Sequence, residues 1–185
     1  MEIIIAPNPV LVKSSRPVAN INQNIQELAK NLASSLANKG IGLSAPQIGQ
    51  NKAVFITKIP REKTKIFINP TIVDHSKEKQ YFYLPENENH PHKDYHPEPF
   101  LEGCLSLPHL YGAVKRWANI EAQWININGQ TIKQTLTGLE AIVFQHELDH
   151  LKGLLFPGRI KKEGGQFFQE KNDQLEKISH QEVNF

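Results

Sequence analysis

Apolar residues recur at helical spacing over residues 20–39. The preceding residues 7–17 contain several prolines. The stripe of this predicted helix consists of Ile25, Leu28, Leu32 and Leu36. Gly40 follows as a helix stop. The pattern predicts an extended N-terminal arm and then one amphipathic helix that buries its apolar face.

A second helical pattern lies between Thr137 and Gly153. Thr137 and Glu140 have the spacing of a capping box at the start of a helix, and Gly153 provides a stop. One face of this predicted helix contains Leu139, Ile142, Val143, His146 and His150. Two histidines that continue an apolar stripe need polar partners, because burying an unpaired polar group costs free energy.

Strand patterns accompany these two helices. Residues 54–57 and 66–69 are rich in β-branched and aromatic side chains. Residues 120–127 and 130–136 flank Asn128-Gly129, which predicts a hairpin with a two-residue turn. Local hairpins with separate helices predict an α+β fold in which antiparallel or mixed β-sheets pack around a central helix, and not alternating βαβ units.

The length of 185 residues predicts one domain over residues 1–185. Residues 76–99 are dense in charge, proline and histidine, so we expect a surface insertion there. Residues 154–156 suggest a short apolar strand or turn, and residues 164–185 a final helix or a frayed tail. The insertion contains three histidines that raise a weaker hypothesis of a second metal site, His90, His92 and His96.

Composition and charge narrow the functional classes. The formal net charge of +2 is too small to argue for nucleic-acid binding, although transient contact with a ribosome stays a hypothesis. Cys104 is the only cysteine, which excludes an intramolecular disulfide and favours a reducing compartment. The first six residues lack the features of a signal peptide, and no stretch has the length of a membrane span. We therefore expect a soluble, cytoplasmic protein without a membrane partner.

The candidate chemistry lies in Gln145-His146-Glu147-Leu148-Asp149-His150. His146 and His150 are four residues apart, so on a helix both imidazoles can reach one cation. Glu147 projects to one side of them, which suits a carboxylate that moves a proton of water without binding the metal. The motif alone is equally consistent with a buried helix whose histidines form hydrogen bonds.

Two further segments have alternative interpretations of the same kind. Cys104 is either a small core residue or a third metal ligand. The small residues at 40–49 form either a helix stop with a tight turn or a backbone that approaches a ligand closely. Three ligands would leave a position for water, as in catalytic zinc sites, and imidazoles also suit iron, cobalt and nickel. Such a site beside Glu147 predicts a hydrolase.

Three blocks in this order resemble the peptide deformylases, and the looser similarity runs from residue 7 to about residue 159. The blocks are Gly40-Ile41-Gly42-Leu43-Ser44-Ala45-Pro46-Gln47, Glu102-Gly103-Cys104-Leu105-Ser106 and Gln145-His146-Glu147-Leu148-Asp149-His150. The resemblance implies a deformylase fold and removal of the N-formyl group from the formylmethionine of newly synthesised polypeptides, with release of formate. It also implies one divalent metal ion, Fe(II) in the cell, which zinc, nickel or cobalt can replace.

The resemblance assigns roles to individual residues. The implied metal ligands are Cys104, His146 and His150. Glu147 would be the general acid and base, and Gln47 with the backbone N–H of Leu105 would stabilise the oxyanion. The segment with Ile41 and Gly42 would pair with an extended peptide. The methionine side chain would enter an apolar pocket that is bordered by Ile142 and Val143.

Two alternatives and two departures accompany this resemblance. A zinc endopeptidase also carries His-Glu-x-x-His, but the Cys104 block and Gln47 argue against it. A catalytically silent metal-binding or interaction protein of the same fold would not need Glu147.

Ser44 stands where the family usually has alanine, and Tyr111 stands where many bacterial members have a basic residue.

Overall fold

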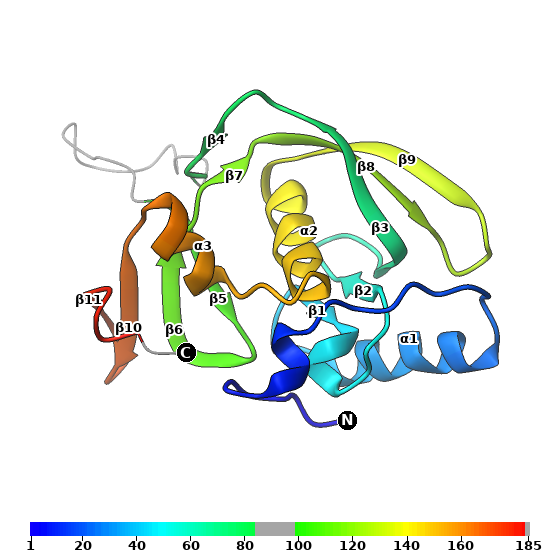
Figure 1. Ribbon diagram of the computed structural model, residues 1–185, viewed down its shortest axis with the longest axis horizontal. Helices are drawn as coiled ribbons and strands as arrows, with labels where there is room; N and C mark the ends of the chain where they lie inside the picture. The colour runs from blue at the N-terminus through cyan, green and yellow to red at the C-terminus, as the bar shows by residue number, and fades with distance from the viewer. Residues whose placement is uncertain (84–98, 184–185) are drawn as a thin grey trace.

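The computed structural model of the chain describes residues 1–83 and 99–183. Helix α2 (Gly138–Leu151) lies between two antiparallel sheets (Figure 1). The larger sheet has the order β1-β2-β3-β8-β9, with β1 Gly42–Ser44, β2 Val54–Thr57, β3 Lys65–His75, β8 Asn119–Ile125 and β9 Thr131–Thr137. The predicted α+β class with sheets around a central helix is confirmed.

The smaller sheet has the order β11-β10-β6-β5, with β5 Leu101–Cys104, β6 Leu107–Ala113, β10 Phe167–Lys171 and β11 Gln174–Ile178. A two-stranded ribbon pairs β4 Lys79–Gln80 with β7 Arg116–Trp117. The remaining helices are η1 Pro9–Val12, α1 Gln23–Leu36, η2 Ala45–Ile48 and α3 Phe156–Glu163. The predicted extended arm thus contains one short 3-10 helix.

Helix α1 is shorter at both ends than residues 20–39. Asn22 caps its start, because the side-chain oxygen accepts a hydrogen bond from the backbone N–H of Ile25 at 3.2 Å. The helix ends at Leu36, since Ala37 adopts a positive φ of 39° before Gly40 is reached. The predicted apolar stripe is confirmed, and all four of its side chains are buried.

The start of α2 differs from the predicted capping box. Thr137 occupies the N-cap position but makes no side-chain cap hydrogen bond. Glu140 forms an ion pair with Lys65 of β3 instead, so its carboxylate is not available to the helix terminus. The stop at Gly153 is confirmed, since this glycine follows the helix end with a φ of 69°.

Strands β8 and β9 confirm the predicted hairpin but not its two-residue turn. The backbone N–H of Asn126 donates to the carbonyl of Gln130 at 2.9 Å, which closes a longer loop. Gly129 has a φ of 81°, whereas Asn128 is not in the left-handed region that a type I′ turn would require of both residues. Strand β3 is also longer than the predicted residues 66–69. It continues past Pro70 because this proline lies at a register shift between Ile68 and Thr71, where a strand tolerates a residue without a backbone N–H.

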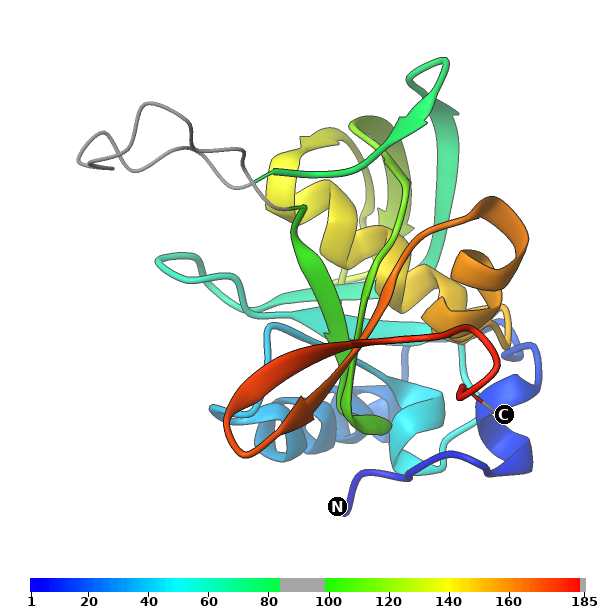
Figure 2. The ribbon, with the colours of Figure 1, turned by 90° about the vertical axis from the view of Figure 1, so that its left-hand side faces the viewer.

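The C-terminal predictions are wrong. Residues 154–156 do not form a strand, and Phe156 is the first residue of α3. Residues 164–185 contain no helix within their described part; they form the β10–β11 hairpin, which joins β6 (Figure 2). Phe167 and Ile178 are buried opposite each other in this hairpin. The burial of this cross-strand pair anchors the hairpin against the core.

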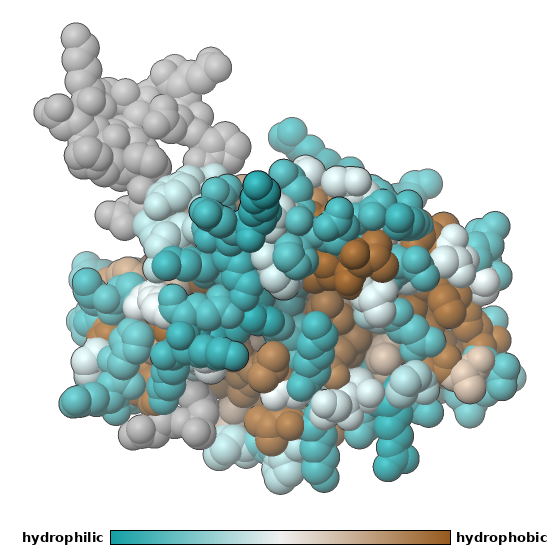
Figure 3. All heavy atoms as spheres, turned by 45° about the horizontal axis from the view of Figure 1, so that its top comes forward, coloured by the Kyte–Doolittle hydropathy of each residue, from teal (hydrophilic) through white to brown (hydrophobic). Residues whose placement is uncertain are grey.

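The expected insertion falls mostly outside the described residues. Residues 76–83 carry β4, and the proposed second metal site at His90, His92 and His96 lies outside the described part. In the described residues, no helix is long and apolar enough to cross a membrane. Hydrophilic side chains cover most of the face in Figure 3, with smaller hydrophobic patches between them.

We expect Gly153→Ala to destabilise the fold more than Gly129→Ala. A Cβ atom at either position meets the cost of a left-handed backbone, about 1 kcal/mol. At Gly153 the Cβ would also lie 2.6 Å from the backbone of Val12, whereas at Gly129 nothing lies within 4 Å. We therefore expect a total loss of about 3 kcal/mol for Gly153→Ala, measured by urea unfolding. Equal losses in the two variants would contradict the close approach.

Candidate metal centre and active-site cavity

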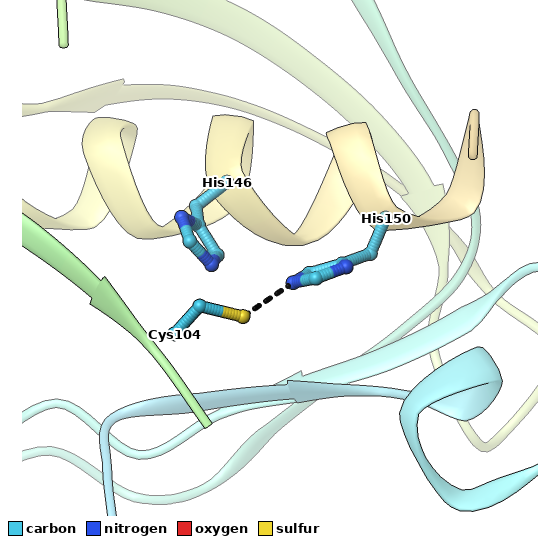
Figure 4. A group of neighbouring side chains, drawn as sticks. All are labelled: Cys104, His146 and His150. Atoms are coloured by element: carbon cyan, nitrogen blue, oxygen red, sulfur yellow. Dashed lines mark hydrogen bonds between the residues drawn. The ribbon is translucent and has the colours of Figure 1, made fainter. Parts of the chain in front are cut away.

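Two elements bring the three predicted ligands together (Figure 4). Helix α2 presents His146 and His150 on one face, and Cys104 lies at the end of β5. Their ligand atoms all lie within 4.8 Å of one another, and the Cys104 Sγ is 3.2 Å from His150 Nε2. One thiolate and two imidazoles suit zinc or iron, so this donor set fits a single metal ion.

A buried carboxylate orients the first histidine. His146 Nδ1 lies 2.8 Å from Glu102 Oε2, so Nδ1 carries the proton that this bond requires and Nε2 is left for a cation. Arg116 holds Glu102 in turn, with Nε to Oε1 at 2.7 Å and Nη2 to Oε2 at 2.8 Å. Glu102 belongs to one of the three matching sequence blocks, but no sequence pattern predicts its role as a partner of His146.

Arg116 also connects this carboxylate to Asp149, near the C-terminal end of α2. Its Nη1 donates to Asp149 Oδ2 at 2.5 Å, and Arg159 Nε donates to the same oxygen at 2.5 Å. Burial opposes the ionisation of Glu102 and Asp149, but the facing guanidinium groups lower the pKa of each carboxyl to about 2. Both carboxyl groups are therefore charged near neutral pH. No motif identified Arg116 or Arg159, because their pairing with Glu102 and Asp149 depends on how separate elements pack together.

The electrostatics of Cys104 favour the form that binds metals. Burial alone would raise the pKa of its thiol, but the neighbouring imidazoles of His150 and His146 lower this pKa to about 5. The thiolate is the metal-binding form of cysteine. This environment fits a ligand better than the alternative of a small core residue.

Glu147 lies beside this centre on α2 and is 3% exposed. A Cβ atom at Gly42 would be 2.4 Å from Glu147 Oε1, so the carboxylate depends on a bare backbone at this point of β1. The other oxygen, Oε2, is buried and has no hydrogen-bond partner among the described residues. Burial raises the pKa of Glu147 to about 7, which suits a group that accepts and releases a proton.

The Gln47 side chain points its amide nitrogen toward the centre. Its Oε1 accepts hydrogen bonds from the Ser44 backbone N–H at 2.9 Å and the Ser44 hydroxyl at 2.8 Å. Its Nε2 lies 3.6 Å from Cys104 Sγ and 3.2 Å from Ser106 Oγ. The two donors from Ser44 fix which end of the amide faces the metal ligands. The Ser44 hydroxyl therefore helps to orient the Gln47 amide.

A cavity of about 410 Å³ opens over the centre. The predicted residues in its lining are Ile41, Gly42, Gln47, Cys104, Leu105, Ile142, Val143, His146 and Glu147. His150 lies beneath them and is 1% exposed. Tyr111 and Glu170 also line the cavity. From the sequence, Tyr111 was only a departure from the family pattern, and Glu170 was missed because the hairpin that carries it was not predicted.

Comparisons with known proteins show which family the chain resembles. The family model described as polypeptide deformylase matches residues 1–166. A peptide deformylase of Phenylobacterium zucineum is 32% identical over 170 residues, which cover 88% of this chain and 90% of the relative. One from Rhizobium meliloti is 34% identical over 165 residues, 86% of this chain and 84% of the relative.

Solved structures show the same similarity. The crystal structure of a Thermotoga maritima peptide deformylase is 28% identical, with a TM-score of 0.72 over 85% of this chain and 95% of the other. A Plasmodium falciparum peptide deformylase is 32% identical, with a TM-score of 0.72 over 85% and 84% of the two chains. The resemblance seen in the sequence is confirmed, and neither a zinc endopeptidase nor a silent protein is supported.

We expect Arg116→Met to destabilise the protein by about 3–5 kcal/mol, because it leaves Glu102 and Asp149 as buried charges without their shared partner. The matched control is Lys133→Met, which breaks an exposed pair with Glu121 and should cost less than about 1 kcal/mol. Urea unfolding of the metal-loaded proteins measures both changes. Similar losses in the two variants would show that the buried pair contributes no more than a surface one.

Proposed function

The chain belongs to the polypeptide deformylase family, and we propose that Cys104, His146 and His150 hold the metal ion of this enzyme. As in its relatives, the reaction is removal of the N-formyl group from the start of newly made polypeptides. The observation that carries the ligand assignment is the approach of one thiolate and two imidazoles to within 4.8 Å. No further protein ligand is needed for an open catalytic site.

The proposed mechanism assigns proton transfer to Glu147. A metal ion held by Cys104, His146 and His150 would supply Lewis acidity, which would lower the pKa of water toward neutrality. Glu147 accepts a proton from the attacking water as the new C–O bond forms at the formyl carbon. It then delivers this proton to the amine nitrogen as the C–N bond breaks, so formate and a free amino terminus leave. Its buried position beside His146 supports this role.

Two donors would stabilise charge on the formyl oxygen. We assign them as Gln47 Nε2, which Ser44 orients toward the centre, and the backbone N–H of Leu105 next to Cys104. Because both donors are fixed before the substrate arrives, they need not reorganise as negative charge develops. A buried site strengthens such hydrogen bonds relative to water.

The free edge of β1 supports binding of an extended peptide. Strand β1 is the outer strand of its sheet, with β2 as its neighbour. The Ile41 carbonyl accepts from the Lys58 N–H at 2.8 Å, so alternation along the strand turns the backbone of Gly42 toward the free edge. We propose that the substrate adds to this edge and places its methionine against Ile142 and Val143, which are 4% and 6% exposed.

The proposal extends to the metal and the cellular setting. We propose Fe(II) as the working ion, with zinc, nickel or cobalt as replacements, since thiolate and imidazole ligands accept all four. A reducing cytoplasm would keep the single thiol at Cys104 free to bind metal. There the enzyme would meet formylated nascent chains, through at most transient contact with the ribosome.

We expect Glu147→Gln to retain metal and lose activity by a factor of about 10² to 10⁴, because the amide keeps the shape but cannot carry the proton. Formate release from formyl-Met-Ala measures the activity, and metal analysis after desalting measures the content. Glu140→Gln is the matched control on the same helix and should leave both unchanged, since Glu140 pairs with Lys65 at the helix start. Full activity of Glu147→Gln at equal metal content would remove Glu147 from its role.

The metal proposal predicts sensitivity to air. Protein loaded with iron should lose activity in air, and protein loaded with zinc or nickel should keep it, because Fe(II) is readily oxidised and zinc has no redox chemistry. The measurement follows formate release with time in air and under argon, at matched metal content. If the iron and zinc forms decayed at the same rate in air, iron oxidation would not be the cause.

A further inference from the structure

One acidic side chain lines the cavity from outside the metal centre. Glu170 lies on β10, and its side chain is 35% exposed. The other two carboxylates of the lining, Glu102 and Glu147, are buried and belong to the centre itself. Glu170 therefore presents a charge at the rim of the cavity, where a substrate would enter or leave.

Neighbouring side chains hold this carboxylate in place. The Tyr111 hydroxyl donates to Glu170 Oε2 at 3.3 Å, and His109 Nδ1 lies 3.2 Å from the same oxygen. Partial burial and the nearby Glu170 raise the pKa of Tyr111, so its hydroxyl stays a donor. Both contacts engage Oε2, which leaves Oε1 without a partner within residues 1–83 and 99–183. This oxygen can accept a bond from a ligand.

The sheet sets the distance from Glu170 to the metal centre. Strands β5, β6 and β10 are successive neighbours (Figure 1). Gly103, next to Cys104, pairs with Tyr111. Two strand separations amount to about 10 Å. An extended peptide spans about 3.3 Å per residue, so about three residues cover this distance. With the formyl group at the centre, the second or third residue of the peptide would reach Glu170.

We propose that Glu170 is a specificity-determining residue that favours a basic side chain, and disfavours an acidic one, at the second or third position of the formylated peptide. The inference rests on the proposed function, because it requires the formyl group to lie at the Cys104, His146 and His150 centre. Lys39 also lines the cavity and comes from the segment between α1 and β1. A preference governed by Lys39 would have the opposite sign.

The test compares kcat/KM for two peptide series on the metal-loaded full chain. One series is formyl-Met-Ala-X and the other is formyl-Met-X-Ala, with lysine, glutamine or glutamate as X. In at least one series we expect lysine to exceed glutamate by about fivefold to twentyfold, the scale of partly exposed charge contacts. The assay runs at pH 8, above the usual titration range of imidazoles, so that histidine charge does not mask the effect.

Variants then assign the preference to Glu170. Glu170→Gln should bring the lysine-to-glutamate ratio below twofold, and Glu170→Lys should invert it. The matched control is Glu176→Gln on β11, whose side chain is 55% exposed and pairs with Lys171, and which should keep the wild-type ratio. Added salt should reduce the wild-type ratio, since exposed charges are screened.

The outcomes separate this inference from the proposed function. Wild-type protein that deformylates every peptide without a charge preference, or a ratio unchanged in Glu170→Gln, would overturn the role of Glu170 alone. Wild-type protein that releases no formate even from the glutamine peptides would overturn the assigned active site. Each ratio is taken within one variant, so a general loss of activity does not imitate a change of preference.

Discussion

The buried pairing of Arg116 with Glu102 and Asp149 is the interaction on which the rest of the site depends. Its guanidinium joins a carboxylate from β5 to one from α2. Charges in the interior are stable only when they are paired and hydrogen-bonded, so these two elements must meet in one arrangement. Glu102 then fixes the orientation of His146, and β5 places Cys104 against the same helix. The geometry of the metal centre follows from this ionic network.

The same helix brings Glu147, the proposed proton-transferring group, to the edge of the other sheet. Glu147 fits only because Gly42 has no side chain, and Gly42 also turns its backbone to the free edge of β1. A peptide added to that edge would therefore pass beside the carboxylate without a flexible loop to place it. In this arrangement, the proposed substrate binding and acid–base chemistry would share one contact between α2 and β1.

The sequence was sufficient to predict the parts of the site that depend on local geometry. The four-residue spacing of His146 and His150 fixes their common face on any helix. It was not sufficient for contacts between distant residues: the partners Arg116 and Asp149 are 33 residues apart, and Glu140 is bound by Lys65 and not by its own helix terminus. Neither pairing leaves a local pattern in the sequence, because each depends on which elements pack together.

In the C-terminal hairpin, the pairing of distant residues determines which side chains line the cavity. Phe168 pairs with Tyr111, so Phe168 and Glu170 lie on the face of the sheet that Tyr111 shares, whereas Phe167 faces the core. A shift of the register by one residue would exchange these faces, exposing Phe167 and removing Glu170 from the cavity. Burial of Phe167 therefore fixes the position of Glu170, and the stability of the hairpin and the charge at the cavity rim depend on the same register.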